Sequence, residues 1–326
     1  MWRQARKVSL THLLLSISVL TAILTSPVTH GQQASFLQTH HTERAETQFD
    51  YQWLDSNGEL RTLSFSLPED HPDDLFAKLK KFSASRMNRS LLRPLTHFAR
   101  QQGWYQMEVR LSPFQKSIVY HPHIANSSLS LDRIAKMRAE EQKQRQAVLS
   151  ESFLTTFTIP PNQIGLAPDH SRIAAASMAQ VEPVSRAFYN SLSGSSARDY
   201  VRVIASFIQA IPYNELTNRL DSNGQGFLPP AQLLLENKGD CDSKVTLMAA
   251  ILKNLMPNMT MVVVYMPNHA LLAIAVNALE DDITIEYNGM KLVVVEPTGP
   301  SQLNIGKLAS SSTLHVLSGN ITVKPI

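Results

Sequence analysis

A nearly all-apolar segment that follows a glycine turn constrains the fold of this chain most. From residue 238 to residue 252 it reads Lys-Gly-Asp-Cys-Asp-Ser-Lys-Val-Thr-Leu-Met-Ala-Ala-Ile-Leu. Beyond its first turn, a helix of this sequence is apolar on almost every side, so it has to be buried in a core. Four short runs that read as strands follow it, at 260–266, 269–276, 283–287 and 291–296. We therefore expect an α+β fold in which this helix packs on an antiparallel sheet.

The N-terminus has the pattern of a secretory signal peptide over residues 1–31. Three basic side chains near the start precede an apolar run from Leu10 to Leu24, and small residues lie near Gly31. This pattern predicts a periplasmic or secreted protein. The run is short for a membrane span of about 20 residues. An uncleaved membrane anchor stays the alternative.

Charge gives little support for nucleic-acid binding. The formal net charge is +3, and residues 1–31 hold three basic and no acidic side chains. Removing that segment leaves 3 − 3 = 0, so the high pI is partly a property of the export signal. We expect no nucleic-acid partner, and membrane contact only if the N-terminal segment is uncleaved. The sequence leaves the oligomeric state open.

The 326 residues are enough for two domains with separate cores. The region 32–47 is polar and reads as a loose linker, and Asn57-Gly58 between alternating apolar residues predicts a hairpin. A helical pattern at 75–102 contains Pro94, which predicts a kink or a split. The charged region 132–150 predicts a solvated helix. We predict a signal peptide at 1–31, a smaller N-terminal α+β domain of unknown role with a linker helix at 32–170, and a catalytic domain at 171–326.

Cys241 is the only cysteine of the chain, and it lies at the start of the predicted apolar helix. An exported chain with one cysteine cannot use it for an internal disulfide. A helix N-terminus favours a thiolate, so we expect a lowered thiol pKa at this position. Cys241 is thus a candidate nucleophile. A small buried core residue is the alternative.

A thiol nucleophile needs a base, and the base needs a group that orients it. His269 begins a predicted strand after a turn, and Glu296 ends the last strand of the next hairpin. Neighbouring strands can bring the two side chains to the same height, facing the Cys241 helix. We expect Glu296 to hold the Nδ1–H of the imidazole. A structural histidine and an ordinary strand-end carboxylate are the alternatives.

Three short motifs resemble the transglutaminase-like fold of the papain-type cysteine enzyme superfamily, and in particular its bacterial and archaeal transglutaminase-like cysteine peptidases. The motifs are Gly239-Asp-Cys-Asp-Ser-Lys244, Asn268-His-Ala270 and Val295-Glu-Pro-Thr298. The runs at 203–213 and 227–236 also fit. The resemblance covers about residues 195–300, roughly a third of the chain.

The resemblance implies a Cys-His-Glu triad of Cys241, His269 and Glu296, although Asp is commoner than Glu at the third position. It also implies an acidic residue with an orienting role at Asp242 and an oxyanion donor at Gln209, for which a structural amide is the alternative. Ser243 departs from the family, which has Asp there.

The implied protein is a thiol protease or amidase that acts on a protein or peptide substrate through a thioester acyl-enzyme. No cofactor and no metal are expected. Transfer of the acyl group to an amine, as in a transglutaminase, is one alternative. A binding or assembly factor that keeps the fold without turnover is the other.

Overall fold

The computed structural model describes residues 33–69, 82–124, 127–159, 163–217, 226–267, 269–299 and 301–326. The predicted signal peptide at 1–31, the start of the helix predicted at 75–102, most of the glycine loop at 221–227, and Asn268 lie outside these ranges. In the part that is described, no helix has both the length and the apolar character to cross a membrane.

The main sheet is antiparallel, curled and five-stranded, in the order β10-β11-β9-β8-β12. The predicted strands are confirmed, and β12 adds an edge strand that the sequence did not indicate. Both faces of the sheet are buried: Val263 and Leu272 contribute to the large central core, whereas Val262 and Ala273 contribute to a second core beneath α10. This explains why the strands read as continuous apolar runs. Their bounds are β8 Met261–Met266, β9 His269–Ile274, β10 Thr284–Tyr287, β11 Met290–Val295 and β12 Thr322–Pro325.

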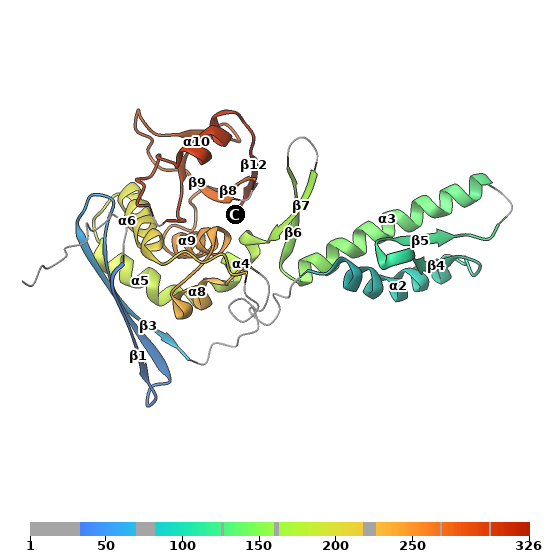
Figure 1. Cartoon of the computed structure of the whole chain (residues 1–326), viewed down its shortest axis with the longest axis horizontal. Helices are drawn as coiled ribbons and strands as arrows, with labels where there is room; N and C mark the ends of the chain where they lie inside the picture. Colours follow the sequence, from blue (N-terminus) through green and yellow to red (C-terminus); the bar gives the residue numbers. More distant parts are fainter. Residues whose placement is uncertain are drawn as a thin grey trace, which may run out of the picture.

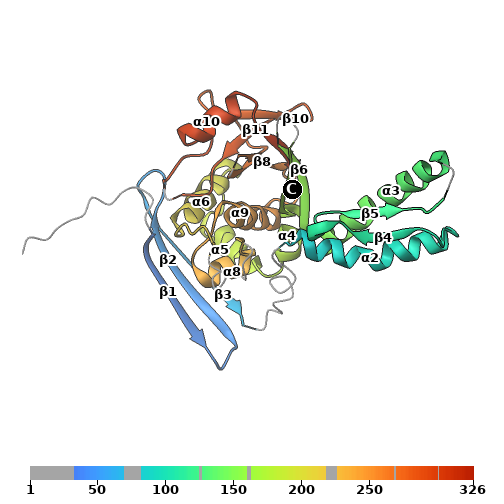
Figure 2. The same ribbon diagram turned by 45° about the vertical axis from the view of Figure 1, so that its right-hand side comes forward.

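Helix α9, Cys241–Leu255, lies in the centre of the molecule (Figures 1 and 2). It packs on β9 on one side and on helices α4, α5, α6 and α8 on the others. Its residues from Ser243 to Leu252 are all buried, as the apolar sequence predicted. The structure is therefore α+β, with the cysteine-bearing helix against the antiparallel sheet. The remaining helices of this body are α4 His170–Ser177, α5 Glu182–Ser191, α6 Ala197–Ala210, α8 Pro230–Glu236 and α10 Ser310–Leu317.

A three-stranded sheet covers the side of the body formed by α5 and α6 (Figure 1). Its strands are β1 Gln33–His41, β2 Glu46–Leu54 and β3 Leu60–Pro68. The hairpin at Asn57-Gly58 is confirmed, and Gly58 has the positive φ of 79° that this turn requires. The loose linker predicted at 32–47 is wrong, because β1 pairs with β2 along its length.

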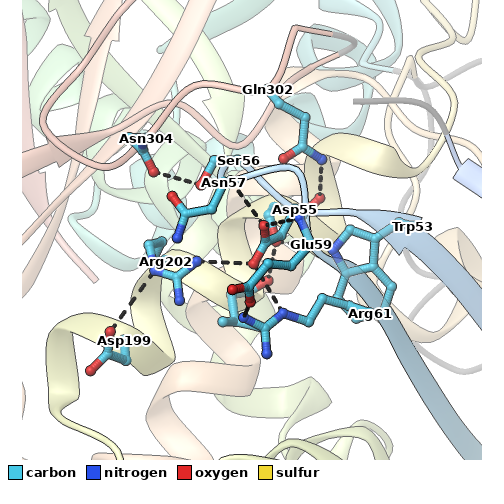
Figure 3. Close-up of polar contacts among 12 residues, drawn as sticks. Trp53, Asp55, Ser56, Asn57, Glu59, Arg61, Asp199, Arg202, Gln302 and Asn304 are labelled. Atoms are coloured by element: carbon cyan, nitrogen blue, oxygen red, sulfur yellow. Dashed lines mark hydrogen bonds and ion pairs between the residues drawn. The ribbon is translucent and has the colours of Figure 1, made fainter. Parts of the chain in front are cut away.

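The loop at Asp55 attaches this sheet to α6 through buried charges (Figure 3). The fully buried Asp55 carboxylate accepts hydrogen bonds from the backbone of Asn57 and Glu59, from Arg61 at 2.9 Å and from Arg202 of α6 at 3.0 Å. Burial would raise the pKa of this carboxyl, but these four donors outweigh it and hold the pKa below its ordinary value. Asp55 therefore stays ionised at the point where this loop contacts α6.

The packing divides the chain differently from the predicted boundary near residue 170. Phe49, Tyr51 and Trp53 of β2 belong to the same core as α9, and Trp53 donates a hydrogen bond to Ser206 at 3.0 Å. The alternating pattern of β2 indicated a half-buried strand correctly, but it could not indicate which helices would cover it. Residues 33–68 thus belong to the same body as residues 170–326.

Residues 84–151 form a separate unit with its own core, which projects away from the body on the side opposite the three-stranded sheet (Figures 1 and 2). Pro94 does not split α2, which is one helix with a buried face of Met87, Leu91 and Leu95. The charged helix α3 is mostly solvated, as predicted. A hairpin of β6 and β7 leads back to the body. The elements are α2 Ala84–Gln101, β4 Glu108–Leu111, β5 Ile118–His121, α3 Ser127–Glu151, β6 Leu154–Ile159 and β7 Gln163–Pro168.

Candidate active site

Cys241 is the first residue of α9, and Asp240 is its N-cap, with a carboxylate that accepts the Ser243 N–H at 3.0 Å. Gly239 is required one step earlier because a Cβ there would lie 2.7 Å from the Leu233 side chain of α8. The backbone N–H of Gly239 also donates to Pro212 O at 3.2 Å. These contacts set the point at which the helix begins, and with it the position of the thiol.

The Cys241 thiol is partly exposed and contacts the start of β9. The backbone N–H of Ala270, next to His269, donates a hydrogen bond to its sulfur, as does the N–H of Asp242. Because Ala270 adjoins His269, this contact brings the thiol to the strand end that carries the predicted base.

The expected lowering of the thiol pKa is wrong for this environment. Burial raises the pKa of Cys241 first, and the negative charges of Asp242 and Asp240 raise it further, to about 12. The two backbone N–H groups lower it, but they are outweighed. The helix N-terminus therefore carries two carboxylates beside the sulfur, and these oppose the helix dipole. The resting group is a protonated thiol.

His269 and Glu296 are in direct contact, as predicted. Nε2 of the imidazole lies 2.8 Å from Oε1 of the carboxylate. Strands β9 and β11 are neighbours, with Val295 opposite Leu272. In that register the residue opposite His269 is two positions beyond Glu296. The imidazole reaches the Glu296 carboxylate with its distal nitrogen, Nε2. The prediction that Nδ1 faces Glu296 is therefore wrong, and Nδ1 is the nitrogen left for another partner.

The Glu296 carboxylate is buried and held by more than the imidazole. Its Oε2 accepts the backbone N–H of Ala309 at 2.9 Å, and its Oε1 accepts the Ser312 hydroxyl at 3.3 Å. Burial would raise its pKa, but the hydrogen bonds from His269, Ala309 and Ser312 outweigh it and keep the pKa below its ordinary value. Glu296 is thus ionised and fixed, which orients the imidazole. No sequence pattern pointed to Ala309, because it acts through its backbone, or to Ser312, which lies in a run of serines.

Gln209 does not serve as an oxyanion donor in this structure. Its Nε2 donates to the backbone oxygens of Glu296 at 2.7 Å and Leu303 at 3.1 Å, which uses both amide hydrogens. Its Oε1 accepts the Leu303 N–H at 3.3 Å. The buried amide therefore positions the backbone of Glu296, and the structural alternative holds.

Lys244 is a fully buried lysine that sequence reasoning missed, although a lysine within an apolar helix was a visible signal. Its ammonium donates to the backbone oxygens of Ile211 at 2.5 Å and Thr298 at 2.6 Å. Burial lowers its pKa to about 7, and the nearby Asp240 carboxylate opposes this shift. Lys244 thus joins the nucleophile helix to the end of α6 and to the segment just after Glu296.

Asp242 has a role different from the orienting one implied by the resemblance. Its carboxylate lies 3.5 Å from Nε2 of His170, a buried side chain of α4, and is partly exposed. Nδ1 of His170 is 2.7 Å from the Thr246 hydroxyl. Asp242 therefore pairs with a second histidine, and its charge acts on Cys241 through space.

Tyr213 is another neighbour that the sequence did not single out for chemistry. Burial first, and then the charges of Cys241 and Asp240, raise the pKa of its phenol, so it remains a neutral donor. It is 45% exposed, which makes the hydroxyl accessible to a bound substrate.

No family model, no curated protein and no solved structure matches this chain. Within the described ranges, no group of three or more His, Cys, Asp or Glu side chains is arranged to hold a metal ion.

Proposed function

We propose that this protein is an exported cysteine-dependent amide hydrolase of the transglutaminase-like, papain-type kind, acting on a protein or peptide. The observation that carries the proposal is the 2.8 Å contact between Nε2 of His269 and Glu296, at the strand end whose Ala270 N–H contacts the Cys241 sulfur. A nucleophile, a base and a fixed carboxylate are the three parts that the proposed chemistry requires.

The ionised Glu296 accepts the Nε2–H of His269, so the neutral imidazole keeps its lone pair on Nδ1. Nδ1 takes the proton from the Cys241 thiol while the sulfur attacks the amide carbonyl. The C–N bond then breaks, the imidazolium gives its proton to the departing amine, and a thioester remains. Water, deprotonated by the same nitrogen, hydrolyses the thioester and regenerates the thiol.

The raised thiol pKa makes the base essential. With a pKa of about 12, only about one thiol in 10⁵ is ionised at pH 7 without help. Proton transfer to His269 therefore accompanies the attack, and a stable thiolate does not precede it. Without this base the thiol should react only slowly with alkylating and oxidising reagents, both of which require the thiolate.

Reactivity of the thiol tests this proposal without a known substrate. We expect iodoacetamide to label Cys241 at pH 7 at least tenfold faster in the wild type than in His269→Ala. His97→Ala, which removes an exposed histidine of α2 in the projecting unit, is the matched control and should label like the wild type. Equal labelling of the wild type and His269→Ala would remove the catalytic assignment. Hydrolysis is then separated from amine transfer by offering a fluorogenic peptide amide with and without dansylcadaverine.

A further inference from the structure

A cavity of about 190 Å³ lies beside Asp242, the residue directly after Cys241. Drug-sized ligands occupy cavities of about 300–1,000 Å³, so this one suits a single long side chain. Its walls come from the segment before α2, from the β6–β7 hairpin and from the segment before α8. Apart from Asp242, the lining residues are Phe82, Leu154, Leu166, Ala167, Pro168, Gly226 and Phe227.

Asp242 is the one charged side chain in this lining, as far as the described residues go. The other side chains of the lining are apolar, so none of them can donate a hydrogen bond to the carboxylate. A carboxylate in such surroundings gains most from a cationic donor.

The histidine next to Asp242 makes no hydrogen bond to its carboxylate in this structure. Nδ1 of His170 lies 2.7 Å from the Thr246 hydroxyl, which also lies 2.8 Å from the backbone oxygen of Asp242. Nε2 of His170 is buried without a hydrogen-bond partner and lies 3.5 Å from the Asp242 carboxylate. The carboxylate therefore receives no hydrogen bond from this histidine and can accept one from a bound cation.

We infer that this cavity binds the side chain of a lysine or arginine adjacent to the amide bond that Cys241 attacks. The inference rests on the proposed function and names its substrate class. The apolar walls contact the aliphatic stem, and the ammonium or guanidinium group donates to the Asp242 carboxylate. Because Asp242 follows the nucleophile in sequence, a side chain held there keeps its own backbone close to the thiol.

The test compares fluorogenic peptides that differ only at the two residues flanking the scissile amide, with lysine in one series and norleucine in the other. Norleucine keeps the stem and lacks the charge. We expect the wild type to favour lysine at one flanking position by about tenfold in kcat/KM, and Asp242→Asn to reduce that ratio to about one. The ratio is the readout because Asp242 also affects the thiol itself, and that effect is common to both peptides.

Two further variants make the result specific. Asp242→Glu restores the charge and should restore the lysine preference, whereas Asp132→Asn removes an exposed carboxylate of α3 and should leave the ratio at its wild-type value. Equal kcat/KM for lysine and norleucine peptides in an active wild type would overturn the inference alone. Absence of peptide hydrolysis together with labelling independent of His269 would overturn the proposed function and the inference with it.

Discussion

Replacing Glu296 with glutamine isolates the role of the carboxylate because the two side chains have the same shape. Oε2 accepts a hydrogen bond from the backbone N–H of Ala309. Because a backbone N–H can only donate, the single side-chain oxygen of glutamine must stay at this position. The new NH₂ then takes the place of Oε1, where it faces Nε2 of His269 and the hydroxyl of Ser312. The hydroxyl can rotate to accept, and the imidazole can accept only by moving its proton from Nε2 to Nδ1. Glu296→Gln therefore keeps the fold and inverts the histidine tautomer.

The inverted tautomer removes the lone pair that accepts the thiol proton. General-base catalysis contributes about 10²–10⁴-fold, so we expect kcat/KM on a peptide amide to fall by about that factor. Three hydrogen bonds to a charged acceptor become neutral ones, which should reduce the free energy of unfolding by only about 1–2 kcal/mol. Urea denaturation measures the second quantity, and iodoacetamide labelling at pH 7 reports the loss of the base without a substrate.

Nitrogen NMR of the His269 ring decides the mechanism. In the wild type the proton should be on Nε2, and in Glu296→Gln it should be on Nδ1. Glu286→Gln, at an exposed position of β10 in the same sheet, is the matched control and should change neither the tautomer nor the rate. A variant that keeps the proton on Nε2 and yet loses activity would refute this reasoning, as would full activity with the tautomer inverted.

Three more predictions follow from the charges. Asp242→Asn removes a charge that raises the pKa of Cys241, so its labelling by iodoacetamide at pH 9 should become severalfold faster than in the wild type. Asp55→Asn removes a counter-charge from Arg61 and Arg202, which are partly buried, and should reduce the free energy of unfolding by about 3 kcal/mol in urea. Asp132→Asn, at an exposed position of α3, is the control that should change little. The pKa of Asp55 and that of Glu296 are both lowered in the folded state. Their contribution to the free energy of unfolding is therefore present above the unfolded pKa values of 3.8 and 4.5, and it is lost as the pH falls through the lower folded values. The melting temperature should drop below about pH 4, and less steeply in Asp55→Asn; equal slopes would contradict the assignment.

Much of the site could be predicted because its parts are local in sequence. The apolar run after Cys241 indicated a buried helix, and the strands that carry His269 and Glu296 were visible as apolar runs that end at turns. What the pattern could not give is the register of β9 and β11. That register decides which imidazole nitrogen meets Glu296, and the predicted nitrogen was the wrong one.

The electrostatic prediction failed for a different reason. A helix N-terminus alone lowers a thiol pKa, but burial and the positions of Asp240 and Asp242 depend on the folded chain. Gln209 was likewise assigned to the site from its place in the sequence, whereas its amide hydrogens are used by backbone oxygens that only the tertiary structure brings near. Contacts between residues that lie far apart in the chain leave no periodic pattern in the sequence from which they could be predicted.

The contact between Asp55 and Arg202 has a consequence for how the protein is made. The two residues are 147 positions apart in the chain, so β2 is synthesised long before the helix that covers it. At a synthesis rate of about 5–20 residues per second, about 7–30 s pass between the synthesis of Asp55 and that of Arg202. During that interval Phe49, Tyr51 and Trp53 have no helix against which to pack. A newly made chain therefore exposes the apolar face of this sheet until α6 has been synthesised.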